Sequence, residues 1–135
     1  RIPSPIGVGM SSKTILSVFL QRARNGETIT LRGRGTRRQN YVDVRDIAQA
    51  VLKAIQAPNL SECYHIVAQR TVSNVELAKL CIQMSGSQSD IKFEGQDSSD
   101  GVDWRADGCL AEKELGFVPQ YTLEATIAWM RSEMR

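Results

Sequence analysis

One segment constrains the fold more than any other, because it passes from strand patterns to a helix pattern across a glycine turn. Thr28–Leu31 is a short run typical of a strand, and Gly33-x-Gly35 then breaks it. Tyr41–Val44 alternates as a second strand. The helix that follows stops before Pro58, and one of its faces is formed by Ile47, Val51, Ala54 and Ile55. This order of elements predicts a mixed α/β fold.

Further elements are predicted on both sides of this segment. Ser11-Ser12 is expected to cap a helix that ends at Asn25-Gly26, and Ser73–Glu76 is a capping box that opens a helix ending at Gly86. The remaining predictions are strands over Cys63–Val67 and Ile91–Glu94, a helix over Leu110–Leu115 before Gly116, and a last helix capped by Thr122 with a stripe of Leu123, Ile127, Met130 and Met134. No linker or repeat interrupts the pattern, so residues 1–135 are expected to form one domain.

The composition argues against several classes of protein. Hydrophobic residues make up 41% of the chain and charged residues 24%, without an apolar run long enough to cross a bilayer, so we expect no membrane partner. The net charge of +2 argues against nucleic acid as a partner. Cys63, Cys81 and Cys109 lie far apart without a C-x-x-C motif, which favours buried free thiols and a cytoplasmic location over disulfides or a zinc site.

The strongest local chemistry is a group of arginines around the Gly33-x-Gly35 turn, namely Arg32, Arg34, Arg37 and Arg38. Guanidinium groups match phosphate oxygens, and glycines let the backbone approach a ligand closely, so the group is a candidate anion site. A solvated hairpin tip explains the same pattern as well. RNA binding is a third and weaker interpretation, because few aromatic residues are interleaved with the arginines.

The residues by themselves provide no catalytic set. The lone His65 has no second histidine with which to share a metal or a proton, and it is expected to be structural. The acidic residues between Asp97 and Asp107 lack the glycine and the terminal glutamate of a calcium loop, so a solvated loop is expected there. The sequence contains no Gly-x-Ser-x-Gly, H-E-x-x-H, P-loop or Gly-x-Gly-x-x-Gly motif.

Three segments share motifs, in order, with one known family. Arg1–Gly9 is similar to R-x-x-N-x-Y-G-P-G, and Gly33–Asp46 is similar to G-x-G-x-x-x-R-D-Y-V-x-V-x-D-V-A, with Asp46 as the expected helix cap. Asp107–Pro119 is similar to D-x-S-K-A-x-x-x-L-G-W-x-P. On these motifs the chain resembles the C-terminal region of extended short-chain dehydrogenases of the NAD-dependent epimerase/dehydratase family, such as UDP-glucose 4-epimerases and dTDP-glucose 4,6-dehydratases.

The resemblance implies that residues 1–135 are the small α/β C-terminal substrate-binding domain of such an enzyme, a fragment without the N-terminal Rossmann half. In the family that half carries the cofactor loop and the catalytic Tyr-x-x-x-Lys pair. No cofactor is therefore expected on this chain, although NAD or NADP is implied for the parent enzyme. The fragment is expected to be inactive alone, to bind a sugar or nucleotide-sugar substrate, and to form a homo-oligomer through the face that the missing half would cover. The alternative is a noncatalytic anion- or protein-binding module that keeps the fold.

The resemblance also implies substrate-binding positions. Ser4 stands where an asparagine is common, Tyr41 matches an aromatic residue that contacts the substrate, and Asp100 matches an acidic position of the nucleotide pocket. The two usual phosphate-binding arginines are replaced by Gln39 and Asp97. We expect neighbouring arginines to take over the anion contact, from among Arg37, Arg38 and Arg105.

Overall fold

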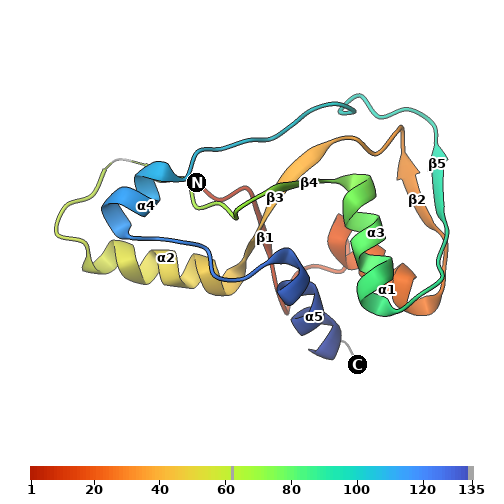
Figure 1. The fold of residues 1–135 in the computed structure, drawn as a ribbon, viewed down its shortest axis with the longest axis horizontal. Helices are drawn as coiled ribbons and strands as arrows, with labels where there is room; N and C mark the ends of the chain where they lie inside the picture. Colours follow the sequence, from red (N-terminus) through yellow and green to blue (C-terminus); the bar gives the residue numbers. More distant parts are fainter. Residues whose placement is uncertain (62, 134–135) are drawn as a thin grey trace.

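The computed structural model describes residues 1–61 and 63–133, and its helices and strands form a mixed α/β fold, which confirms the predicted class. In chain order the elements are β1 (Ser4–Ile6), α1 (Ile15–Asn25), β2 (Ile29–Arg32), β3 (Arg38–Asp43), α2 (Val44–Gln56), β4 (Thr71–Ser73), α3 (Asn74–Ser85), β5 (Ile91–Glu94), α4 (Cys109–Leu115) and α5 (Leu123–Glu133). Figure 1 shows β3 in the middle of the molecule, with α2 and α4 at one end and α1, α3, β2 and β5 at the other.

β3 is the central strand of a three-stranded sheet. β1 runs parallel to it with Ser4 opposite Tyr41, and β4 pairs antiparallel with the first half of β3, where Arg38 lies opposite Ser73. Parallel neighbours need a long crossover, and residues 7–37 provide it because they include α1 and β2. β2 and β5 form a separate parallel pair. β4 therefore pairs with the first half of β3 and β1 with the second half.

The hydrophobic core has two parts, and β3 contributes to both. Tyr41 belongs to the larger part, where it packs with side chains of α1 and α3 such as Leu16 and Leu77. Its neighbour Val42 belongs to the smaller part beneath α2 and α4, together with residues such as Phe117. Successive residues of a strand point to opposite faces, so one strand can serve two clusters.

Several helix ends lie where the sequence predicts them. Gly26, Gly86 and Gly116 end α1, α3 and α4 in the left-handed conformation. The capping box at the start of α3 is confirmed, because Ser73 N donates to Glu76 Oε2 at 2.8 Å and Glu76 N donates to Ser73 Oγ at 3.1 Å. These ends depend on residues close together in the sequence.

The predicted cap of α2 is wrong, because Asp43 caps this helix instead of Asp46. Asp43 accepts a hydrogen bond from Arg45 N at 2.8 Å. β3 runs directly into α2, so the last strand residue keeps the extended backbone that an N-cap needs. The buried Asp46 carboxylate accepts instead from Gln120 N at 2.9 Å and from Tyr121 N at 3.1 Å, which ties α2 to the segment before α5.

The predicted cap of α1 is also wrong. This helix begins at Ile15, after Thr14, which forms no side-chain cap bond. Ser11 Oγ accepts from Lys13 N at 3.3 Å and therefore stabilises the turn before the helix. The cap of α5 is consistent with the sequence, since Ala125 N donates to Thr122 Oγ1 at 3.1 Å; Met134 of the expected stripe lies outside the described residues.

Cys63–Val67 does not form the expected strand. Ile66 N donates to Arg1 O at 2.9 Å, but no strand ladder develops around this bond. The short strand β4 forms further along the chain, and its three residues carried no strand pattern in the sequence. Pairing with β3 therefore decides that the strand forms at Thr71–Ser73 and not at Cys63–Val67.

Two of the three cysteines contradict the prediction of burial. Cys63 and Cys109 are exposed, whereas Cys81 lies in the core, where burial raises the pKa of its thiol to about 12. All three are free thiols. Among the helices that the structure describes, none has the length and apolar character needed to cross a membrane.

Candidate functional site

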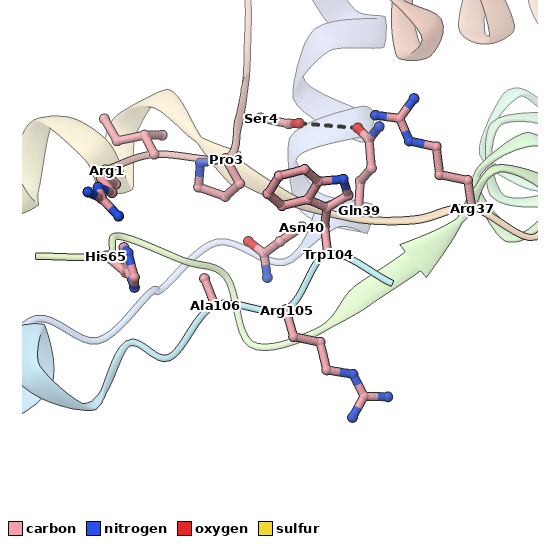
Figure 2. A pocket seen from close by; sticks show the side chains of 11 residues that line it. Arg1, Pro3, Ser4, Arg37, Gln39, Asn40, His65, Trp104, Arg105 and Ala106 are labelled. Atoms are coloured by element: carbon pink, nitrogen blue, oxygen red, sulfur yellow. Dashed lines mark hydrogen bonds between the residues drawn. The ribbon is translucent and has the colours of Figure 1, made fainter. Parts of the chain in front are cut away.

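A hollow of about 540 Å³ opens beside the start of β1 and the start of β3, under the loop that precedes α4 (Figure 2). Its volume is in the range of small-molecule sites, roughly 300–1,000 Å³. The hollow is lined by Arg1, Ile2, Pro3, Ser4, Arg37, Gln39, Asn40, His65, Trp104, Arg105 and Ala106. Three of these described residues are arginines and none is acidic, so the lining favours a negatively charged ligand.

A chain of hydrogen bonds runs from Arg37 through Gln39 to Ser4 at the base of the hollow. With its oxygen turned toward Arg37, the Gln39 amide accepts from Nη2 at 2.8 Å and from Nε at 3.0 Å, and its nitrogen lies 3.3 Å from Ser4 Oγ. The opposite orientation keeps the contact with Ser4, which Figure 2 draws, but places the amide nitrogen against the guanidinium donors. Because Gln39 is neutral, it orients Arg37 without cancelling its charge.

The second side of the hollow is the loop that carries Trp104 and Arg105. Arg38 N donates to Val102 O at 2.8 Å, and Trp104 N donates to Arg38 O at 3.2 Å, so the loop runs alongside β3. The Trp104 side chain is 62% exposed. Arg105 Nε lies 2.7 Å from Asp103 Oδ2, and this exposed ion pair balances part of its charge.

The third side of the hollow is the segment that contains His65, and Asn40 holds this segment in place. The buried Asn40 side chain donates from Nδ2 to Ala68 O at 2.8 Å and accepts from Ala68 N at 2.8 Å. These two bonds replace the backbone pairing that a strand would provide. His65 lies in the lining beside Arg1 and Ala106 (Figure 2).

Arg38 lies outside the hollow and is engaged with β4 and α3. Its Nη2 donates to Thr71 O at 2.8 Å and lies 3.0 Å from Glu76 Oε2. The hydrogen bond from the Ser73 amide and the neighbouring Arg38 guanidinium hold the pKa of Glu76 below its ordinary value, although burial opposes them. The charge of Arg38 is thus balanced within the protein.

Tyr41 also lies outside the hollow, in the larger part of the core. Its hydroxyl is buried and has no hydrogen-bond partner among the described residues. Burial raises the pKa of Tyr41 to about 12, against the opposing influence of Arg37. The position that the resemblance assigns to substrate contact is therefore occupied by a core residue.

The Gly33-x-Gly35 turn binds an anion that belongs to the chain itself. Asp100 Oδ2 accepts from Arg34 N at 2.7 Å, and Oδ1 accepts from Thr36 N and Thr36 Oγ1, both at 3.1 Å. The backbone amides of Arg34 and Thr36 lower the pKa of Asp100 below its ordinary value. The carboxylate therefore occupies the backbone donors that the sequence offered to an external anion.

The structure brings some of the predicted substrate-binding residues together and separates others. Ser4, Arg37, Gln39 and Arg105 line the hollow, whereas Arg38, Tyr41 and Asp100 do not. Whether these residues bind a substrate stays a prediction. Asn40, His65 and Trp104 also line the hollow, although no pattern in the sequence connected them with the site. An exposed tryptophan beside an arginine in a polar loop could have signalled Trp104, but no local pattern reveals that Asn40 and His65 meet.

Comparison with known proteins identifies relatives of this chain. The model of the NAD dependent epimerase/dehydratase family matches residues 1–68. The chain is 27% identical over 129 residues to the low-salt glycan biosynthesis protein Agl12 of Haloferax volcanii, covering 92% of this chain and 40% of that protein. It is 26% identical over 123 residues to dTDP-glucose 4,6-dehydratase of Streptomyces niveus, covering 87% of this chain and 36% of that protein.

Solved structures share the fold. UDP-glucose 4-epimerase from Thermotoga maritima, solved with UDP-glucose, matches with a TM-score of 0.88 at 22% identity over 98% of this chain and 43% of that chain. A dTDP-glucose 4,6-dehydratase from Bacillus anthracis, solved with NAD, matches with a TM-score of 0.85 at 19% identity over 98% of this chain and 44% of that chain. The chain therefore spans less than half the length of these relatives.

Proposed function

Because the chain belongs to the NAD dependent epimerase/dehydratase family, we propose that residues 1–135 are the substrate-binding domain of an enzyme that acts on a nucleotide sugar. The observation that carries the proposal is the hollow with three arginines and no acidic residue in its described lining. One relative is named for dTDP-glucose, and one similar structure contains UDP-glucose, so a sugar joined to a nucleoside diphosphate is the substrate class that fits.

The geometry of the hollow supports a role in binding and orienting the substrate. Arg37 presents a guanidinium held by the neutral Gln39 amide, which leaves its charge available for a diphosphate. The Ser4 hydroxyl and the Gln39 amide are suited to hydrogen bonding with sugar hydroxyls. The epimerisation, dehydration or reduction step itself is proposed to depend on residues outside this chain, because the described lining of the hollow contains no nucleophile–base pair.

NAD or NADP is proposed to bind to another part of the enzyme. The Gly33-x-Gly35 turn does not fit a dinucleotide, because the Asp100 carboxylate already occupies its backbone amides. A Cβ atom at Gly33 would lie 2.2 Å from Asp100 Oδ2, which shows how little space remains there. When bound, the cofactor would supply hydride chemistry, and this domain would bind and orient the substrate.

Partners are proposed for the exposed apolar face of α2. Val51, Leu52 and Ile55 are 53%, 51% and 75% exposed, and a groove beside them continues toward Ile2. Such a contiguous apolar surface commonly marks an interaction site. The cofactor-binding half and a second copy of the chain are the partners that we expect there. Because the cysteines are free thiols, we also propose a cytoplasmic location.

The test is calorimetric titration of the 135-residue chain with UDP, comparing Arg37→Ala with Arg34→Ala. Arg34 is a matched control because it is an exposed arginine from the same cluster that does not line the hollow. A charge-assisted contact contributes roughly 1.5–3 kcal/mol, so Arg37→Ala should raise the dissociation constant by more than about tenfold. Arg34→Ala should change it by less than about twofold.

The outcomes separate the two functional classes. Saturable UDP binding that depends on Arg37 supports a nucleotide-sugar site. Binding that is equally sensitive to Arg34 would mean that general positive charge attracts the ligand. An absence of saturable UDP binding would contradict the proposal and favour the noncatalytic module.

A further inference from the structure

The loop between β5 and α4 needs an attachment that fixes its course. It covers residues 95–108 and contains no helix, and a single bridge, between Asp103 and Arg38, pairs it with the other residues that the structure describes. Nevertheless its far end carries Trp104, Arg105 and Ala106 to the hollow (Figure 2). A segment with so little regular pairing opens easily unless other contacts hold it.

Asp100 provides such a contact with the turn between β2 and β3. Its carboxylate accepts from Arg34 N at 2.7 Å and from Thr36 N and Thr36 Oγ1 at 3.1 Å each. Thr36 Oγ1 accepts in return from Gly101 N at 2.9 Å, so the connection runs in both directions. The donors of this turn and the Asp100 carboxylate that they contact are thus 64 to 66 residues apart in the sequence.

The turn is shaped around this carboxylate. Gly33 has a φ of +61°, a conformation that favours glycine, and an added Cβ would lie 2.2 Å from Asp100 Oδ2 and 2.9 Å from Asp97 N. Gly33 N also donates to Glu94 O at 3.1 Å, which anchors the start of the same loop. A larger residue at this position would displace the carboxylate or the loop backbone.

The attachment at Asp100 lies only a few residues before the part of the loop that lines the hollow. Arg38 N donates to Val102 O at 2.8 Å, and Trp104 N donates to Arg38 O at 3.2 Å. These two backbone hydrogen bonds tie the loop to the start of β3 shortly after Asp100. Loosening Asp100 should therefore weaken both of them and shift Trp104 relative to Arg37.

We propose that Asp100 is a positioning residue, which fastens the loop to the Gly33–Thr36 turn and thereby sets the place of Trp104 and Arg105 in the hollow. This inference rests on the proposed function of the hollow for its effect on ligand affinity. The resemblance implied direct ligand contact at this position, but the carboxylate oxygens are directed to the turn. Asp100 acts on the site through the loop, without touching the ligand.

The test compares Asp100→Asn with Asp97→Asn in the 135-residue chain. Asp97 is the matched control, because its carboxylate accepts from Ser99 N at 2.8 Å and from Ser99 Oγ at 2.5 Å, within the loop itself. Amide hydrogen exchange of Arg38 and Trp104 reports the attachment of the loop, and UDP titration reports the hollow. Thermal unfolding distinguishes a local change from a loss of the fold.

Asp100→Asn should speed the exchange of the Arg38 and Trp104 amides by about tenfold or more and weaken UDP binding by roughly three- to tenfold. Asp97→Asn should leave both readouts within about twofold of the parent chain. Where Asp100→Asn fails to fold, Thr36→Val replaces it, since this variant removes only the hydroxyl link and should speed the same exchange by a smaller factor.

Unchanged exchange at Arg38 and Trp104 in the folded variants would overturn the inference, as would equal effects of the Asp97 and Asp100 substitutions. A parent chain that does not bind UDP would contradict the proposed function separately. In that case the exchange data still decide whether Asp100 holds the loop.

Discussion

Replacing Tyr41 by phenylalanine is expected to stabilise the fold, the opposite of the usual effect of trimming a buried side chain. Tyr41 is 6% exposed, and its hydroxyl has no hydrogen-bond partner among the described residues. A buried polar group without a partner costs roughly 1–3 kcal/mol. Phenylalanine keeps the ring in the core and removes this cost, so Tyr41→Phe should raise the free energy of unfolding by about 1–2 kcal/mol.

The matched control is Tyr64→Phe, which removes a hydroxyl that has partners. Tyr64 Oη accepts from Ser61 N at 2.7 Å and lies 2.7 Å from Glu114 Oε2, to which it donates. Because these bonds are partly exposed, their loss should lower the free energy of unfolding by about 0.5–1.5 kcal/mol. The same substitution is therefore expected to raise the free energy of unfolding at Tyr41 and to lower it at Tyr64. Urea denaturation followed by circular dichroism at pH 7 measures both changes.

The pH dependence of the free energy of unfolding, measured for the parent chain and for Tyr41→Phe, provides an independent check. Burial raises the pKa of Tyr41 from 10.0 to about 12, although Arg37 opposes this shift. A folded pKa above the unfolded value means that the contribution to stability is complete below pH 10 and is lost as the pH rises toward 12. A shift of this size corresponds to about 3 kcal/mol, so the advantage of Tyr41→Phe should grow across this window. A variant less stable than the parent at pH 7, with a constant difference up to pH 12, would refute the reasoning.

Two other predictions concern the His65 side of the hollow and the apolar face of α2. Asn40→Ala removes both side-chain bonds to Ala68 and should lower the free energy of unfolding by about 2–4 kcal/mol, whereas Asn25→Ala on the surface should change it by less than about 0.5 kcal/mol, as urea denaturation measures. Ile55→Asp should reduce self-association, as measured by light scattering coupled to size-exclusion chromatography. Phe93 is also an exposed apolar residue but lies on β5, so Phe93→Asp should leave self-association unchanged. A parent chain that is monomeric at every concentration would contradict the expected homo-oligomer.

The sequence predicted the fold best where the deciding contacts were local. The glycine at the end of α3 and the capping box at its start lie within the helix that they bound, so their signals could be read directly. At α2 the choice between Asp43 and Asp46 depended on whether a loop separates strand and helix. β3 runs into α2 without such a loop, and a composition pattern does not reveal that the backbone changes conformation at Asp43.

The candidate site was harder to predict because distant partners decide which charges remain free. The sequence shows a group of arginines beside two glycines, which is a reasonable anion site until the rest of the chain is placed. Glu76 then pairs with Arg38, and Asp100 occupies the backbone donors of the turn. Only the folded chain shows that Arg37 alone among the four lines the hollow.

The proposed anion site has Arg37 in its lining and Gln39 at the position where the resemblance implies an arginine. Glu76 balances Arg38 at 3.0 Å and Asp103 balances Arg105 at 2.7 Å, but no described carboxylate forms an ion pair with Arg37. Positions 37 and 39 are two residues apart, and alternate residues of an extended chain share a face, so both side chains reach the same hollow. Opposite unit charges 4 Å apart attract with about 4 kcal/mol at an effective dielectric constant of 20. The affinity of the proposed site for a diphosphate should therefore depend strongly on Arg37, and an arginine placed at position 39 should be able to replace it.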